Sequence, residues 1–321
     1  MKRKVLYFLG RRVLPCLLLL ASMLLSLGLS QQRNKALAFG GEETTFGVQI
    51  DTHAAAKIPS PLQLEILGPA WVRGDYSQVT FSSAWPADVK NLVLVNNETT
   101  RTPPPGRSMP FSAWRTYVNA VYVPKLNQIL AANSFVPAIE LWNEEDFCRS
   151  GYCPYIPPQE YAYLLERATR TIKTKSPATK VVMGGLVSGQ IQYLKAVMQG
   201  SPGGFAQIDA VGLHPYGTSP DGWCAHGCSG GKLPFGDLAT GVTKYQSVAH
   251  KPVWVTEIGY GSRDTFWQAE YLRRCFIVLR RLHVPVVIWY AWIDTMNPKF
   301  GLMDARGNLK LAGAVFRSFS Q

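Results

Sequence analysis

Eight short apolar segments, separated by longer segments with helical periodicity, constrain the fold of this chain most strongly. Alternation of this kind is typical of a parallel α/β sheet whose strands are connected by covering helices. The eight predicted strands are residues 46–51, 71–75, 91–96, 137–142, 180–185, 210–214, 252–257 and 285–290. Eight such units predict a single closed (β/α)8 TIM barrel, a fold that commonly occupies about 250 residues as one domain.

The predicted helices lie at residues 61–67, 111–133, 158–176, 191–199, 238–249, 266–282 and 311–319. Two of them, 158–176 and 266–282, are the clearest, because their apolar residues recur on one helical face. The interval 77–90 is short for a second covering helix, so we expect irregular structure there. The proline-rich segment 102–110 predicts a loop.

The first 38 residues have a different composition from the rest. They contain seven basic side chains and no acidic one, and an apolar run extends from Val13 to Leu29. This pattern is typical of an export signal. Cleavage sites are possible after Gly28-Leu29-Ser30 and after Ala36-Leu37-Ala38, and the second, which matches A-x-A better, predicts a mature start near Phe39. An uncleaved anchor is the alternative, because about 17 apolar residues reach the lower limit for a membrane span. We therefore expect a signal peptide or membrane anchor at 1–38 and a single barrel domain at 39–321.

The location expected from this leader is secreted or periplasmic, or anchored to the membrane and facing outside. The formal net charge of the chain is +12, but seven positive charges lie in the leader, which leaves +5 for the rest. No basic stripe interleaved with aromatic residues is found, so we expect no nucleic-acid partner. Nucleotide-binding glycine motifs are likewise missing from the sequence, and we expect no cofactor.

Two pairs of cysteines lie close together in the sequence. In an oxidising compartment, Cys148 with Cys153 and Cys224 with Cys228 are expected to form disulfides that close loops. A zinc site that uses the segment 224–228 is the alternative, although neither pair has the C-x2-C spacing of structural zinc sites. Cys275 lies among apolar residues and is predicted to be a buried thiol.

Acidic residues end two of the predicted strands. Glu144 follows the fourth strand and Glu257 ends the seventh, and strands four and seven face each other across a closed barrel. Two carboxyl groups that converge there suit cleavage of a glycosidic bond, in which a protonated acid assists the leaving oxygen and an ionised one supports the sugar carbon. Glu145 is the competing choice for the acid, and Glu140 is a third carboxylate nearby.

Five motifs in a fixed order add a family resemblance. They are LWNE at 141–144, LHPY at 213–216, WVTEIG at 254–259, WYAWID at 289–294 and FGLMD at 300–304. This series resembles the retaining clan A glycoside hydrolases, nearest to cellulase-like and family 39-like members. The resemblance runs from the fourth strand to the end of the chain, whereas the first three strands match only loosely.

The resemblance implies an exported retaining β-glycosidase that acts on an oligo- or polysaccharide by double displacement, with residues 39–321 as its catalytic domain. It implies that Glu144 is the general acid/base and Glu257 the nucleophile. Asn143 would then bind the sugar hydroxyl next to the reacting carbon.

Further positions are expected to support the site. His214 and Tyr216 end strand six and can hold the nucleophile carboxylate by hydrogen bonds. Arg73 on strand two can supply a positive charge to it, with an ion pair between Arg73 and Asp75 as the alternative.

Two tryptophans at the end of strand eight are candidates for a sugar-binding floor. We expect one of Trp289 and Trp292 to face the cleft, because strand alternation prevents both from pointing inward.

Two other classes of protein remain as alternatives. One is a carbohydrate-binding barrel without turnover, which the intact pair of acids disfavours. The other is a metal-dependent hydrolase, although the sequence has no H-x-H or H-E-x-x-H pairing, so we expect no metal. The ligands of that alternative would be Asp51, His53, Asp75, His214 and Asp294.

Overall fold

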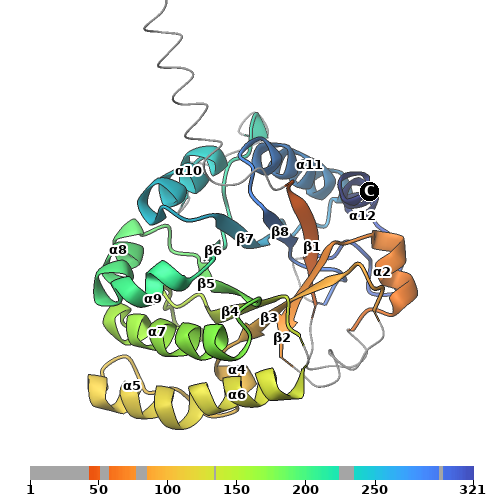
Figure 1. Ribbon diagram of the computed structural model, residues 1–321. Helices are drawn as coiled ribbons and strands as arrows, with labels where there is room; N and C mark the ends of the chain where they lie inside the picture. Colours follow the sequence, from red (N-terminus) through yellow and green to blue (C-terminus); the bar gives the residue numbers. More distant parts are fainter. Residues whose placement is uncertain (1–42, 51–57, 77–84, 134, 224–234, 296–298) are drawn as a thin grey trace, which may run out of the picture. The chain divides into compact units, whose positions relative to one another are not determined.

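The computed structural model describes residues 43–50, 58–76, 85–133, 135–223, 235–295 and 299–321. Eight parallel strands close into a barrel in the order of the chain, which confirms the predicted TIM-barrel architecture (Figure 1). The strands are β1 (Thr45–Gln49), β2 (Trp71–Asp75), β3 (Lys90–Val95), β4 (Ala138–Asn143), β5 (Lys180–Leu186), β6 (Ala210–Leu213), β7 (Val253–Ile258) and β8 (Val286–Trp289). Their bounds differ from the predicted ones by two residues at most.

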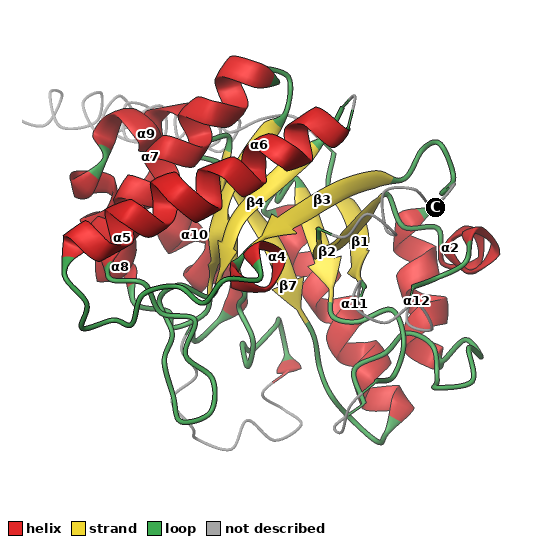
Figure 2. Cartoon of the chain, turned by 90° about the horizontal axis from the view of Figure 1, so that it is seen from below, coloured by secondary structure: helices red, strands yellow, loops and turns green. Residues whose placement is uncertain are grey.

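Helices surround this barrel on the outside (Figures 1 and 2). They are α2 (Pro61–Leu67), α4 (Asn97–Thr100), α5 (Phe111–Tyr117), α6 (Val123–Ala132), α7 (Pro158–Lys175), α8 (Ile191–Gly200), α9 (Pro202–Gln207), α10 (Leu238–Ala249), α11 (Thr265–Arg281) and α12 (Leu311–Ser320). The short helices α4 and α9 were not expected. Residues 102–110 form a loop as predicted, and 77–84 of the segment expected to be irregular lie outside the described residues.

The predicted helix at 111–133 is continuous but contains a π-helical turn. This turn, η2 (Val118–Tyr122), joins α5 to α6 directly before Pro124. Proline has no N–H to donate to the preceding turn, and its ring clashes with the carbonyl four residues earlier. The wider π turn gives the chain a way to pass the proline without ending the helix.

One group of apolar side chains fills part of the barrel interior, and we call it the apolar layer. Its members alternate along the strands with residues that face the helices, because successive side chains of a strand point to opposite faces. The layer consists of Trp71, Leu92, Ala138, Val182, Ala210, Trp254, Val286 and Ile288. Within it, the rings of Trp71 and Trp254 meet edge to face, with centroids 5.4 Å apart.

The leader expected at residues 1–38 lies outside the described residues, and so does the predicted mature start. Within the described part of the chain, no helix combines the length and apolar character that a membrane crossing requires. Cys275 on α11 is a buried free thiol.

Candidate active site

Arg73 lies at the centre of a charged network inside the barrel, two residues beyond Trp71 on β2. Its fully buried guanidinium donates from Nε to Glu140 (2.5 Å) and from Nη1 to Glu257 (2.5 Å). It also donates to the side-chain oxygens of Gln49 (2.8 Å) and Asn143 (2.9 Å). Burial alone would lower the pKa of Arg73, but the charges of Glu140 and Glu257 outweigh it and raise the pKa. The guanidinium is therefore a fixed positive charge.

Asp75 was the alternative partner of Arg73. Its charge also raises the pKa of Arg73, but it acts less strongly than Glu140 and Glu257. The guanidinium thus belongs to the site and links four strands, because Arg73 lies on β2 and its partners come from β1, β4 and β7.

Glu257 reaches the site because the register of β7 shifts. Val255 pairs with Val287 and Ile258 with Trp289. Between these two pairs β7 advances by three residues and β8 by only two, so β7 contains one extra residue. An extra residue of this kind bulges the strand and redirects side chains. The Tyr216 hydroxyl donates to Oε2 of Glu257 at 2.9 Å. Burial would raise the pKa of Glu257, but His214, Arg73 and the Tyr216 hydrogen bond together lower it, which favours the ionised carboxylate.

Glu144 is turned into the site by an unusual backbone conformation at the end of β4. Trp142 and Glu144 both have positive φ angles, 81° and 54°. Such angles are uncommon for residues other than glycine and cluster at functional sites. They direct the Trp142 indole outward, where its N–H donates to the Pro154 carbonyl at 2.8 Å, while Glu144 enters the barrel mouth.

His214 connects the acidic groups from β6. Its Nδ1 lies 3.2 Å from Oε1 of Glu144 and 3.9 Å from Oε2 of Glu257, and its Nε2 lies 3.1 Å from the Thr256 hydroxyl. The imidazole is therefore closer to Glu144 than to Glu257, the carboxylate that we expected it to hold. Burial lowers the pKa of His214, but the Glu257 charge and the Glu144 hydrogen bond raise it overall.

The three side chains form a compact group. One oxygen of Glu144, one oxygen of Glu257 and one ring nitrogen of His214 all lie within 4.8 Å of one another. Gly185 on β5 leaves the space for the imidazole, because a Cβ at that position would overlap the His214 ring.

Glu145 points away from this group. It is fully buried, and its carboxyl group packs against Gly184, where a Cβ would overlap it. Burial is the main cause that raises the pKa of Glu145 well above its usual value, followed by the charge of Asp146. Of the two adjacent acids, only Glu144 lies beside His214 and Glu257.

The two tryptophans expected at the sugar floor are both buried, which corrects that expectation. Trp289 is 0% exposed and Trp292 is 2% exposed. Alternation on β8 places Val286 and Ile288 inside the barrel, so Trp289 faces the helices, where its ring meets Phe276 of α11. Neither indole offers an exposed face to a sugar.

Partly exposed aromatic rings at the site come from other positions, which the sequence pattern did not indicate. The Tyr290 ring, one residue beyond Trp289, lies beside those of Tyr216 (6.4 Å between centroids) and Phe300 (5.5 Å). Tyr152 is 41% exposed, and its hydroxyl accepts a hydrogen bond from the Asn143 amide at 3.1 Å. Gln49 and Thr256 were not predicted either, although Gln49 ends β1 and Thr256 directly precedes Glu257 on β7.

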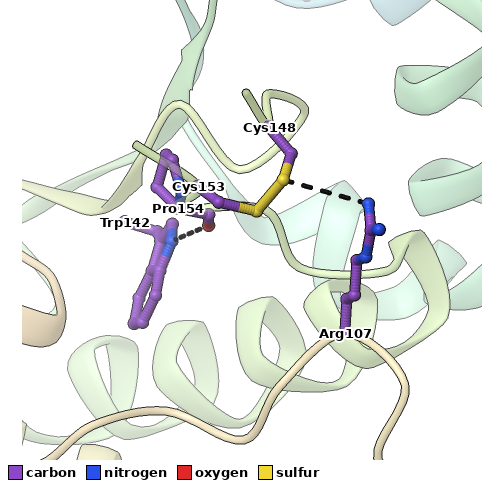
Figure 3. The surroundings of a disulfide bond; sticks show 5 residues. All are labelled: Arg107, Trp142, Cys148, Cys153 and Pro154. Carbon is purple, nitrogen blue, oxygen red and sulfur yellow. Dashed lines mark hydrogen bonds between the residues drawn. A yellow bond between two sulfur atoms is a disulfide. The ribbon is translucent and has the colours of Figure 1, made fainter. Parts of the chain in front are cut away.

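The disulfide between Cys148 and Cys153 is present in the structure, in the loop that follows β4 (Figure 3). Cys224 and Cys228 lie outside the described residues, as do Asp51 and His53 of the alternative metal site. Asp294, another ligand of that alternative, accepts from Lys310 at 3.1 Å and from the Gly301 backbone at 2.7 Å. It does not belong to the group around His214.

Comparison with solved structures finds the same barrel fold in several other proteins. A fungal β-1,4-galactanase superposes with a TM-score of 0.61 at 14% identity, over 85% of this chain and 99% of that one. A β-glucuronidase from Bacteroides uniformis gives 0.59 at 13%, over 88% and 37%. An oligosaccharide-binding protein from Cryptococcus neoformans gives 0.54 at 12%, over 88% and 98%. At these identities the likenesses show the fold alone.

A family model defines the class more closely. Residues 121–316 match the glycosyl hydrolase catalytic core, and the chain belongs to this family. A search of curated proteins found no significant match.

Proposed function

We propose that this protein is an exported retaining β-glycosidase that hydrolyses O-glycosidic bonds of an oligo- or polysaccharide without a cofactor. The proposal includes an affiliation with clan A, near its cellulase-like and family 39-like members. The observation that carries it is the approach of Glu144 and Glu257, which each have a carboxyl oxygen within 4.8 Å of the other's. Retaining enzymes hold their two carboxyl groups about 5–5.5 Å apart, whereas inverting enzymes need about 6.5–9.5 Å to admit a water.

In the first step, Glu257 attacks the sugar carbon and Glu144 transfers its proton to the leaving oxygen. The bond from carbon to Glu257 forms as the glycosidic bond breaks, and the aglycone departs as an alcohol. Arg73 and Tyr216 hold Glu257 ionised and oriented for this attack. Their positive charge and hydrogen bond are in place before substrate binds, so little reorganisation is needed.

In the second step, Glu144 acts as the base. It removes a proton from a water molecule that attacks the same carbon, and Glu257 leaves as a carboxylate, which gives a product of retained configuration. His214 restrains Oε1 of Glu144, and the Thr256 hydroxyl restrains His214 in turn. Asn143 is held by Arg73 through its carbonyl oxygen and donates one amide N–H to Tyr152, so its second amide N–H would donate to a sugar hydroxyl.

Two observations bear on the alternatives and on export. The group of Glu144, His214 and Glu257 has the spacing of a cation site, but Arg73 already contributes a positive charge at Glu257, which favours acid–base chemistry over metal binding. The Cys148–Cys153 disulfide supports an oxidising compartment, either outside the cell or in a periplasm.

The test is hydrolysis of a panel of aryl β-glycosides and β-linked polysaccharides, with the anomeric form of the first product followed by NMR. We expect Glu257→Gln and Glu144→Gln each to lower turnover of unactivated substrates by about a thousandfold or more, with the fold intact by circular dichroism. The matched control is Glu145→Gln, which alters the neighbouring acid and is expected to keep ordinary turnover. Ordinary activity of the Glu257 variant, or an inverted product, would overturn the mechanism. Sugar binding without any turnover would favour the carbohydrate-binding alternative.

A further inference from the structure

Two exposed arginines flank the disulfide in the loop after β4. Arg107 lies in the segment between α4 and α5, and its Nη1 is 3.9 Å from Sγ of Cys148 (Figure 3). Arg149 directly follows Cys148, and its guanidinium lies over the Phe147 ring, 5.6 Å from the centroid. The connections that follow β3 and β4 therefore meet at Cys148 and bring two positive charges to one part of the barrel mouth. We call Arg107 and Arg149 the arginine pair.

The arginine pair has no acidic partner in the part of the chain that the structure describes. Arg170 on the surface of α7, by comparison, forms an ion pair with Glu166 at 2.6 Å. A guanidinium that rests on a ring or beside a sulfur keeps the N–H donors at its edge available for another group. The charge of the pair and most of its donors are therefore available to a ligand.

The backbone around Arg149 is held before any ligand binds. Cys148 and Cys153 are joined by the disulfide, and between them Arg149 and Tyr152 exchange backbone hydrogen bonds of 3.0 and 3.2 Å. The residue after Cys153, Pro154, accepts from the Trp142 indole through its carbonyl (Figure 3). A group that is fixed in advance loses less conformational entropy on binding, which favours recognition at this place.

A series of contacts connects the arginine pair to the catalytic groups. The Phe147 ring beneath Arg149 lies 6.3 Å from the Tyr152 ring, measured between centroids. The Tyr152 hydroxyl accepts from the Asn143 amide at 3.1 Å, and Asn143 directly precedes Glu144. The pair thus lies on the side of the barrel mouth that supplies Glu144. A polysaccharide with one bond at the two catalytic acids continues beyond them, so its neighbouring sugars are the parts that meet this side.

The centre of the site is unsuited to an anionic sugar. Glu144 and Glu257 approach within 4.8 Å of each other there, and Arg73 is already engaged by Glu140 and Glu257. A carboxylate or sulfate on the reacting sugar would lie close to the ionised Glu257, and like charges repel at such distances. An anionic group of the substrate is therefore better placed at the arginine pair, on a sugar next to the reacting one.

We propose that the arginine pair binds an anionic group, a carboxylate or a sulfate ester, on a sugar next to the one that is cleaved. The substrate is then an acidic polysaccharide. This inference rests on the proposed function and deepens it, because it names the charge class of the glycan. Guanidinium groups suit both anions, since their adjacent N–H donors match two oxygens of one group.

The test uses the double variant Arg107→Gln/Arg149→Gln and matched glycans. The substrates are a β-linked uronic-acid glycan, the same glycan after reduction of its carboxyl groups, a sulfated β-glycan and an aryl β-glycoside. We expect kcat/KM for an acidic glycan to fall about tenfold in the variant, mainly through KM, because binding energy is lost while the chemistry is unchanged. The values for the reduced glycan and the aryl glycoside should change less than about twofold. The acidic glycan that shows the loss identifies the anion as carboxylate or sulfate.

The matched control is Arg170→Gln/Arg280→Gln, which removes the same amount of charge from the outer helices α7 and α11. Arg280 also rests on aromatic rings, those of Phe46 and Phe319, but belongs to the C-terminal end of α11. We expect this control to leave the ratio between acidic and reduced glycan unchanged. Equal losses in the two double variants would show that net charge alone attracts the polymer and would overturn the inference.

Binding is measured separately by calorimetry with Glu257→Gln, which is expected to hold a glycan without cleaving it. Affinity for the acidic glycan should fall as the salt concentration rises, and adding the two arginine changes should weaken this dependence. Equal affinity for acidic and reduced glycans would overturn the inference and leave the proposed function intact. If the wild type hydrolyses neither glycans nor aryl glycosides, the proposed function fails, while the binding measurement still decides whether the arginine pair selects an anionic sugar.

Discussion

The inside of the barrel contains two layers that differ in chemistry, although strands such as β2 and β4 contribute to both. On β2, Trp71 belongs to the apolar layer and Arg73, two residues on, is the centre of the charged network. On β4, Ala138 and Glu140 repeat this change. Strand alternation puts both members of each pair inside the barrel, so the change from apolar to charged occurs over one repeat of the strand.

The difference shows how each layer is stabilised. Each apolar side chain gains free energy from leaving water without needing a specific partner, so a change in the apolar layer leaves no unpaired charge behind. A buried charge is stable only when opposite charges and hydrogen bonds surround it. Arg73, Glu140 and Glu257 therefore depend on one another, and the site is a collective feature of five strands and their ends.

The largest difference between the two layers should appear when Arg73, the centre of the charged network, is replaced. Arg73→Met leaves Glu140 and Glu257 buried without their partner, which should lower the free energy of unfolding by about 3–5 kcal/mol. Turnover should fall by at least about a hundredfold, because Glu257 loses the charge that keeps it ionised. Urea unfolding and steady-state rates measure both effects.

The control for this variant is Arg170→Met. Arg170 forms an exposed ion pair with Glu166 on α7, and removing it should change stability by less than about 0.5 kcal/mol. Similar losses in the two arginine variants would contradict the view that the interior charges depend on one another.

A change in the apolar layer should separate stability from activity. Trp254→Ala removes the ring that packs on Trp71 and should lower the free energy of unfolding by about 3 kcal/mol through the cavity it leaves. Because the charged network has its own partners, kcat per folded molecule should stay within about threefold of the wild type. A loss of turnover without a loss of stability would show that the two layers are coupled.

The smallest expected effect is a pH-dependent change in stability caused by the buried Glu145. Glu145 is fully buried and its pKa is raised, so its contribution to stability is complete below its ordinary value of 4.5 and is lost as the pH rises through the higher folded-state pKa. Glu145→Gln does not titrate, and it should stabilise the protein by about 1 kcal/mol at pH 8 and by less at pH 4. Thermal unfolding across this range measures it, and an equal effect at both pH values would contradict the assignment.

Glu257 should show the opposite pH dependence. Its folded-state pKa is lowered, so its contribution to stability is present above 4.5 and is lost as the pH falls through the folded-state value. The two buried acids thus act in opposite directions, and a Glu257→Gln variant should lose less stability than the wild type on acidification.

The periodicity of apolar residues was sufficient to predict the strands and the longer helices of the barrel. All eight strands and the longer helices follow from alternating apolar segments and one-sided helical faces, because those patterns reflect burial directly. Six of the predicted site residues also lie together in the structure, since strand ends of a closed barrel must meet at one edge. They are Arg73, Asn143, Glu144, His214, Tyr216 and Glu257.

The features of the site that the sequence did not predict depend largely on local departures from regular strand geometry. The shift of β7 at Glu257 and the positive φ angles of Trp142 and Glu144 have no periodic signal, so the partner of His214 could not be deduced. The burial of Trp289 follows from its packing against Phe276 of α11, which a single strand pattern does not reveal. Tyr152 was overlooked because its contact depends on the folding back of a six-residue turn.

The two adjacent glycines of β5 have a practical use in sorting sequences. Any side chain at position 185 would occupy the volume of the His214 ring, and any at 184 that of the Glu145 carboxyl. A homologous barrel with a residue larger than glycine at position 185 has to place its imidazole elsewhere. The residue at this position of an alignment should therefore indicate which related barrels can keep the contact between His214 and Glu144.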